Sequence, residues 1–178
     1  MIEVEAKVPV SEREKQLILE KLRRINSMEK AYEEEDLFFI SINDPSFGNN
    51  KTLKLRKSNG RTKLIFKTKR AGDGFKENLE IEVEVKEKDT GNLVQLLNLL
   101  GFKESLVIRK RRLSFCFDHY TINVDDVEGL GSFVEIEILT DESEVERARN
   151  EISKILSVLG ISEKEIILKS YAEMMVNR

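Results

Sequence analysis

The stretch IEVEAKV (residues 2–8) alternates strictly between apolar and charged residues. Successive side chains of a β-strand point to opposite faces, so this alternation predicts a strand with Glu3, Glu5 and Lys7 together on one face. The other face carries only small and branched aliphatic side chains. The fold therefore depends on whether the charged face meets water or lines an enclosed site.

The same alternation recurs in seven further segments, which predicts eight strands in all. Asn59-Gly60, within KSNGR, is typical of a two-residue hairpin turn because both turn positions need positive φ. RAGDGFK (70–76) and FDHYT (117–121) predict further hairpin connections, so most of the sheet should be antiparallel. The seven segments are residues 36–42, 52–57, 61–69, 78–86, 106–117, 120–125 and 133–140.

Helices are predicted between groups of strands. Ser11 and Glu14 form a capping-box pattern at the start of the first helix. A second helix begins at Asp89 and ends at Gly101, a third begins at Thr140 or Asp141 and ends at Gly160, and residues 163–175 are expected to be helical. The apolar residues expected to face the core are Leu17, Ile18, Leu22 and Ile25 in the first helix, Leu93, Leu96, Leu97 and Leu100 in the second, and Val145, Ala148, Ile152, Ile155, Leu156 and Leu159 in the third.

The chain also shows an internal similarity. LEIEVEV followed by a helix ending in LLNLLGF parallels FVEIEIL followed by a helix ending in ILSVLGI. No Pro-rich or Ser-rich linker separates the two parts, and 178 residues suit one domain of ordinary size. We expect a single domain over residues 1–178, built of two related halves.

Charged residues are segregated by strand. Acidic strands are residues 78–86, with Glu80, Glu82 and Glu84 on one side, and 133–140, with Glu135 and Glu137. Basic strands are 52–57, with Lys54 and Arg56, and 61–69, with Lys63, Lys67 and Lys69. In LVIRKRRLSF (106–115) charged residues occupy both sides of the predicted strand: Lys110 and Arg112 share one side, and Arg109 and Arg111 share the other. Alternation alone does not show which pair faces inward.

Alternation alone is also compatible with charged faces that meet solvent on an open antiparallel sheet. Two features favour an enclosed site. A solvated face has no need to sort carboxylates and cations by strand, since like charges close together repel. Three amphipathic helices also need an apolar sheet face to cover, and eight strands are enough to curl. If the helices cover the outside of this sheet, the charged faces line the inside of a barrel.

A charged lumen needs bound ions or paired charges. Carboxylates in E-x-E pairs offer the hard oxygen ligands that Mg²⁺ or Mn²⁺ prefers, and lysines and arginines bind phosphate oxygens. A ligand that needs both is a metal-bound polyphosphate.

These residues resemble a known family. EVEAKV is similar to the E-x-E-x-K signature of the CYTH superfamily, the triphosphate tunnel metalloenzymes, which includes class IV adenylyl cyclases and thiamine triphosphatases. The likeness continues in order through DLFF, LKLRK, LIFKTK, EIEVEV, KRRLSF, VDDVEGLGSFVEIE and KSYAEMM. The chain departs from the family pattern at Phe38, Lys54, Ile65 and Asn78. The resemblance implies the fold class α+β: an eight-stranded antiparallel barrel, or tunnel, with a charged lumen and helices outside. It also places Lys110 and Arg112, rather than their neighbours, in the lumen.

The resemblance also implies roles for individual residues. The metal, Mg²⁺ or Mn²⁺, would be bound by Glu3, Glu5, Glu135 and Glu137, with Glu80 and Glu82 as further candidates. The triphosphate would be bound by Lys7, Lys54, Arg56, Lys67, Lys69, Lys110 and Arg112. The catalytic set would be Lys7, Arg56, Lys67, Lys110, Arg112 and Asp125, with Asp125 holding metal or orienting a lysine.

Three functions stay open on the sequence. An adenylyl cyclase would convert ATP to cyclic AMP and pyrophosphate; a triphosphatase would hydrolyse thiamine triphosphate, inorganic triphosphate or a nucleotide; a polyphosphate-binding module would do neither. The SYAEMM ending favours the cyclase branch.

Other partners and settings follow from composition. The chain has one cysteine and a net charge of −3, so it lacks a disulfide framework, and nucleic acid is not expected to be a partner. Its apolar runs are too short to span a bilayer, and Glu3 and Glu5 stand where a signal peptide needs apolar residues. We expect a cytoplasmic protein with a small-molecule triphosphate as partner, no membrane contact, and a homodimer left open.

Overall fold

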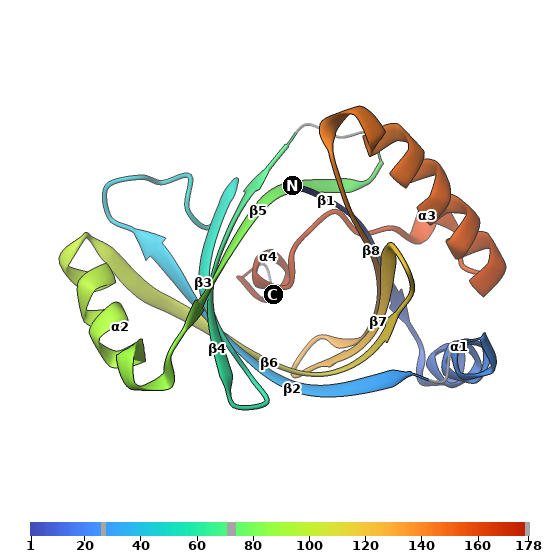
Figure 1. The fold of residues 1–178 in the computed structure, drawn as a ribbon, viewed down its shortest axis with the longest axis horizontal. Helices are drawn as coiled ribbons and strands as arrows, with labels where there is room; N and C mark the ends of the chain where they lie inside the picture. The colour runs from blue at the N-terminus through green and yellow to red at the C-terminus, as the bar shows by residue number, and fades with distance from the viewer. Residues whose placement is uncertain (26–27, 71–73, 177–178) are drawn as a thin grey trace.

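The structure, a computed structural model, describes residues 1–25, 28–70 and 74–176. Antiparallel strands close into a barrel in the order β1-β5-β4-β3-β2-β6-β7-β8, seen end-on in Figure 1. The predicted eight-stranded antiparallel barrel is thus confirmed. The strands are β1 Ile2–Val10, β2 Glu29–Ser41, β3 Lys51–Ser58, β4 Arg61–Lys69, β5 Lys76–Val85, β6 Phe102–Cys116, β7 Tyr120–Val127 and β8 Gly131–Thr140.

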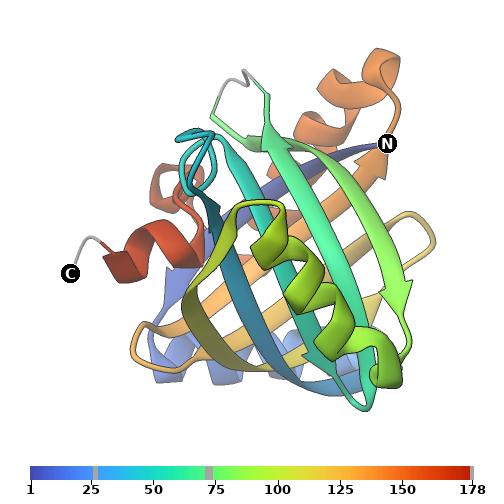
Figure 2. The ribbon, with the colours of Figure 1, turned by 90° about the vertical axis from the view of Figure 1, so that its left-hand side faces the viewer.

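Helices lie outside the barrel, except for a short one near one of its open ends. α1 and α3 pack on one side and α2 on the opposite side, as Figures 1 and 2 show, while α4 lies across the opening in Figure 1. The helices are α1 Glu12–Ile25, α2 Thr90–Leu99, α3 Val145–Leu159 and α4 Tyr171–Val176, with 3₁₀ turns at η1 Glu87–Asp89, η2 Glu142–Glu144 and η3 Glu163–Glu165.

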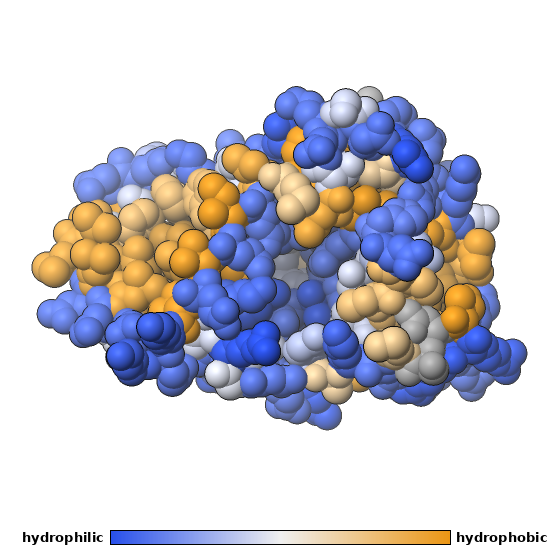
Figure 3. All heavy atoms as spheres, in the orientation of Figure 1, coloured by the Kyte–Doolittle hydropathy of each residue, from blue (hydrophilic) through white to orange (hydrophobic). Residues whose placement is uncertain are grey.

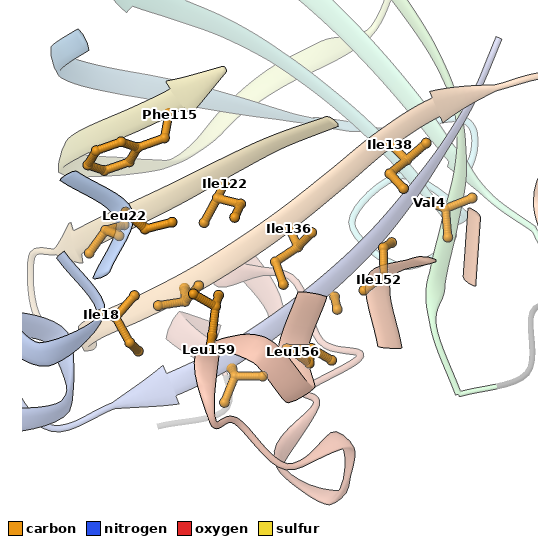
Figure 4. Close-up of a cluster of buried hydrophobic side chains, with 14 of the residues drawn as sticks. Val4, Ile18, Leu22, Phe115, Ile122, Ile136, Ile138, Ile152, Leu156 and Leu159 are labelled. Atoms are coloured by element: carbon orange, nitrogen blue, oxygen red, sulfur yellow. The ribbon is translucent and has the colours of Figure 1, made fainter. Parts of the chain in front are cut away.

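The main apolar core lies between the outer face of the barrel and helices α1 and α3. Val4 and Ile136 project from β1 and β8 toward Ile152 and Leu156 of α3, and all four are fully or almost fully buried (Figure 4). A second cluster beneath α2 joins Leu97 to Phe39, Leu53 and Leu55. Because apolar side chains face outward to the helices, the alternate, charged side chains face inward.

Local signals in the sequence correspond to local structure. Asn59 and Gly60 both have positive φ, 46° and 77°, as the predicted two-residue turn requires. Ser11 and Glu14 form the reciprocal capping box: the Glu14 carboxylate accepts from the Ser11 backbone amide at 2.8 Å, and the Ser11 hydroxyl accepts from the Glu14 amide at 3.3 Å. The connection predicted at RAGDGFK includes residues 71–73, which lie outside the described residues.

Three predictions about the helices were wrong in part. Leu96 and Leu100 of the second helix are 51% and 60% exposed, and only Leu97 of its four predicted core leucines is buried. Leu17 and Ile25 are likewise exposed on or at the end of α1. The predicted helix over residues 163–175 is a 3₁₀ turn followed by extended chain and only the short α4.

No helix in the described part of the chain is long and apolar enough to cross a bilayer.

Candidate functional site

The charged faces of the strands line the inside of the barrel. Glu3, Glu5 and Lys7 of β1 are 4%, 3% and 1% exposed. In the register of the sheet, Glu5 lies opposite Glu137 and Lys7 opposite Glu135 of β8. Figure 3 shows hydrophilic residues around the hollow at the centre of the barrel. The face that opened the sequence analysis therefore borders an enclosed site.

Ion pairs connect the carboxylates of β1 to lysines of β4, β5 and β1 itself. Lys67 Nζ lies 2.7 Å from Glu3, and Lys76 Nζ lies 2.9 Å from Glu5. Lys7 Nζ lies 3.1 Å from Glu5 and 3.4 Å from Glu135. These pairs offset the repulsion between the carboxylates, which burial would otherwise make costly.

A second group joins β2 to β3. Asp36 accepts two hydrogen bonds from the Arg56 guanidinium, at 2.7 and 2.8 Å, and one from Lys54 at 2.8 Å. Burial would raise the pKa of Asp36, but Lys54 and Arg56 hold it well below its ordinary value. Asp36 thus stays ionised and fixes both cations against the tunnel wall.

A third group lies where β6, β7 and the C-terminal segment meet. Arg112 donates two hydrogen bonds to Asp125, at 2.7 and 2.6 Å, and also contacts Glu135. The Tyr171 hydroxyl donates to Asp125 at 3.0 Å, and its ring lies 4.4 Å from Lys7 Nζ. Burial raises the pKa of Tyr171 well above its ordinary value, so its hydroxyl remains a donor.

Two lumen groups have pKa values near neutrality. Burial, with repulsion from Arg56, lowers the pKa of Lys54 to about 8, although Asp36 acts in the opposite direction. Burial also raises the pKa of Glu137 to about 8 against the attraction of Arg112, and Glu3 adds to that rise. Both pKa shifts have the same causes: burial disfavours the charged form of each group, and neighbouring groups of like charge add to the effect.

The carboxylates near β1 and β8 fit a divalent cation in their chemistry. Glu5 Oε1 is buried, and its contact among the described residues is the ion pair with Lys7 Nζ at 3.1 Å. The nearest ion-pair contact of Glu137 in the described chain is Arg112, 3.9 Å away. These oxygens are hard ligands on adjacent strands, which suits Mg²⁺ or Mn²⁺. Among the described residues, however, no three acidic, His or Cys side chains already converge as a cation site.

Most of the predicted site residues come together around one narrow cavity of about 150 Å³. Asp125 does not line it: this residue is 0% exposed and lies behind Arg112, with Lys110 Nζ 3.5 Å away. Glu82 is paired with Lys63 at 2.5 Å, toward the other end of the tunnel. The predicted residues that line the cavity are Glu3, Glu5, Lys7, Lys54, Arg56, Lys67, Lys69, Glu80, Glu82, Lys110, Arg112, Glu135 and Glu137.

On β6 the side chains that face the lumen are the ones that the resemblance implied. Lys110 and Arg112 are 6% and 8% exposed and line the narrow cavity, while Arg109 and Arg111 are exposed on the outside.

Sequence reasoning missed several residues of the site, among them Lys76, Asp36 and Tyr171. Lys76 was not assigned because the strand was expected to begin at Asn78, two residues too late. Asp36 lies in the run EEED, where consecutive acidic residues hide the alternation. Tyr171 lies outside the strands, and the signal for it was the SYAEMM ending, which had been given no role at the site.

Comparisons with known proteins agree with this geometry. A family model described as CYTH domain matches residues 1–171. A Methanocaldococcus jannaschii protein named as a candidate adenylate cyclase is 34% identical over 176 residues, which cover 98% of each chain. A protein of Aeromonas hydrophila named adenylate cyclase CyaB is 30% identical over 84 residues, 47% of this chain and 44% of its own.

Solved structures share the fold. A protein from Pyrococcus horikoshii superposes with a TM-score of 0.85 at 32% identity, covering 98% of both chains. A Hippeastrum protein, described as a candidate adenylyl cyclase with a dominant triphosphatase activity, has a TM-score of 0.70 at 20% identity; the match covers 98% of this chain and 93% of that one.

Proposed function

This chain belongs to the CYTH domain family, and we propose that it is a metal-dependent enzyme acting on a triphosphate. The specific reaction that we propose is that of an adenylyl cyclase, which converts ATP to cyclic AMP and pyrophosphate. The observation that carries the proposal is the narrow cavity. Cations from five different strands, β1, β3, β4, β5 and β6, surround it, and carboxylates of β1 and β8 border it. That combination suits a chain of phosphates with a divalent cation.

The cations have the task of binding and orienting the phosphates. Arg56 and Arg112 are each held by a buried carboxylate, Asp36 and Asp125, which fixes the direction of their remaining N–H groups. The ammonium groups of Lys7 and Lys110 both lie near the Tyr171 ring, 4.4 and 5.4 Å from its centre. Such preorganised charge is the main contribution a protein makes to phosphoryl transfer.

The proposed metal ligands are Glu3, Glu5, Glu135 and Glu137, with Glu80 and Glu82 nearby on β5. When bound there, Mg²⁺ or Mn²⁺ would neutralise charge on the phosphate oxygens and on the leaving group. For cyclisation, the protein must hold the ribose 3′ hydroxyl in line with the α-phosphorus, so that the new O–P bond forms as the bond to pyrophosphate breaks and the hydroxyl proton passes to solvent.

A second candidate is a triphosphatase, in which water attacks a terminal phosphate. It is favoured by the Hippeastrum neighbour, whose dominant activity is described as that of a triphosphatase. Both candidates use the same cation-lined cavity and differ in which nucleophile is held beside which phosphorus.

The test is a product analysis. The protein is incubated with ATP and, separately, with inorganic triphosphate, each with Mg²⁺ or Mn²⁺ and each repeated with EDTA. Cyclic AMP with pyrophosphate supports the cyclase, and released phosphate supports the triphosphatase. Turnover that is unaffected by EDTA contradicts the metal dependence, and binding without turnover leaves a polyphosphate-binding module.

A further inference from the structure

The carboxylates of β1 are already occupied by cations of the protein itself. Lys76 of β5 lies opposite Glu5 in the register of the sheet, and its Nζ lies 2.9 Å from Glu5 Oε2. Lys7 Nζ lies 3.1 Å from the other oxygen, Oε1. Two residues away, Lys67 Nζ lies 2.7 Å from both oxygens of Glu3. A divalent cation that binds Glu5 must therefore take the place of an ammonium group.

Repulsion between such a metal ion and the Lys76 ammonium group would be strong. Glu5 is 3% exposed, and only 13% of the Lys76 side chain is exposed. Water screens charges weakly at that degree of burial, so two cations that share one carboxylate at close range destabilise each other. Either the ammonium group moves away from Glu5 or the metal ion binds weakly.

Of the two lysines at Glu5, Lys76 has the fewer contacts to hold it in place. Lys7 is 1% exposed, donates to the Lys169 carbonyl oxygen at 3.2 Å and lies 3.4 Å from Glu135. In residues 1–25, 28–70 and 74–176, the ammonium group of Lys76 has its one hydrogen bond and ion pair with Glu5. Rotation about its flexible four-carbon stem is enough to separate Lys76 from Glu5.

The narrow cavity offers Lys76 another partner when a triphosphate is present. Lys76 lines this cavity together with Arg56 and Arg112, the two guanidinium groups proposed to bind the phosphates. A phosphate oxygen, like a carboxylate oxygen, accepts a charge-assisted hydrogen bond from an ammonium group. Transfer of the ammonium group from Glu5 to a phosphate would keep the lysine paired and leave Glu5 Oε2 without a cation.

We propose that Lys76 is a positioning residue for the metal. In the ligand-free protein it holds Glu5, and when a triphosphate binds it transfers to phosphate oxygens, so that Glu5 becomes a metal ligand only in the presence of triphosphate. The inference rests on the proposed function, which supplies the triphosphate and the metal, and adds this condition to it. Lys76 acts through Glu5 and does not itself contact the metal.

The test measures metal binding in the absence of any substrate. Mn²⁺ is titrated into each protein and free Mn²⁺ is followed by electron paramagnetic resonance, a readout that needs no turnover. Wild-type protein is compared with Lys76→Met and Lys76→Gln, which remove the charge, and with Lys76→Arg, which keeps it. Lys15→Met is the matched control, because Lys15 of α1 lies outside the barrel, pairs with Glu12 and Asp126 at 2.7 Å each, and carries the same charge.

We expect wild-type protein to bind Mn²⁺ weakly on its own. Lys76→Met and Lys76→Gln should lower the Kd for Mn²⁺ about ten- to a hundredfold, the effect of removing one competing charge-assisted contact. Lys76→Arg and Lys15→Met should leave this Kd close to that of wild type. In separate titrations with EDTA present, the Kd for inorganic triphosphate should rise about tenfold in Lys76→Met and Lys76→Gln, which have lost a phosphate-binding cation, and stay unchanged in Lys15→Met.

Three results would overturn the inference while the proposed function stands. In the first, wild-type protein alone binds Mn²⁺ as tightly as the two neutral variants of Lys76 do. In the second, Lys15→Met lowers the Kd for Mn²⁺ by the same factor, so that net charge alone explains the effect. In the third, the neutral variants bind inorganic triphosphate as tightly as wild type does. If wild-type protein binds no triphosphate, with Mn²⁺ or without it, the proposed function fails together with this inference.

Discussion

Triphosphate affinity should decrease as the pH rises above 8, because Lys54 loses its proton there. Lys54 is 8% exposed, and burial lowers its pKa to about 8. The charges that act on it are Arg56, Lys110 and Lys67, which disfavour its proton, and Asp36, which favours it. A phosphate oxygen bound beside Lys54 would add a negative charge and raise this pKa again.

The magnitude follows from the linkage between binding and protonation. Above the pKa of Lys54 in the free protein, triphosphate binding takes up a proton. The affinity for triphosphate is therefore highest below about pH 8 and decreases as the pH rises through that value. Each pH unit above 8 raises Kd by up to about tenfold, until the pKa of the complex is reached. At about pH 9.5 the Kd should therefore be about thirtyfold higher than at pH 7.

Calorimetric titration of inorganic triphosphate with Mg²⁺, from about pH 7 to about pH 9.5, measures this change. Lys54→Arg is the matched control, because arginine stays charged throughout the range. Titration of Glu137 and of the ligand itself acts on both proteins alike, so the ratio of their Kd values isolates Lys54. A ratio that does not change with pH would refute the reasoning.

Three further predictions concern other groups of the site. Glu5→Gln should abolish metal-dependent turnover while circular dichroism and Tm show a folded barrel; full activity would remove Glu5 from the proposed metal site. Arg56→Ala should raise the Kd for inorganic triphosphate by about ten- to a hundredfold, the loss of one charge-assisted contact of about 1.5–3 kcal/mol, and unchanged binding would contradict its role. Tyr171→Phe removes the hydrogen bond to Asp125 and should lower the free energy of unfolding by about 1 kcal/mol in urea denaturation. It should also lower kcat, because Asp125 orients Arg112; a stability loss without any change in kcat would make the contact purely structural.

The barrel could be predicted because strand alternation and turn chemistry are local properties. Period-two patterning located all eight strands, and Asn59-Gly60 fixed one hairpin. The burial of helix faces was harder to predict. In α2 the leucines are so frequent that period alone selects no single face, and contact with Phe39, Leu53 and Leu55 decides that Leu97 is buried. That choice depends on tertiary packing, which the spacing of residues within the helix does not contain.

The site could be predicted only where its residues lie in alternating strands. Lys7, Lys67 and Arg112 follow the alternation or the family pattern, and the structure brings them to one cavity. Tyr171 reaches that cavity because the chain after α3 returns across one end of the barrel, where the Ile167 amide donates to the Lys7 carbonyl oxygen at 2.8 Å. Lys7 and Tyr171, which are 164 positions apart in the sequence, meet by this route. No local sequence pattern encodes such a contact.

The ion pairs of the lumen explain why the barrel can fold with its charges inside and why its carboxylates are not already arranged as a cation site. Seven carboxylates and eight cationic side chains line the narrow cavity, so its charge is nearly balanced without a ligand. Glu3 and Glu5 are held by Lys67 and Lys76, and both lysines have ammonium groups that phosphate oxygens can bind as well. A triphosphate that draws Lys67 and Lys76 toward itself would release carboxylate oxygens of Glu3 and Glu5. Because those oxygens then need a new positive partner in a desolvated place, the proposed binding of triphosphate and of a divalent cation should each favour the other.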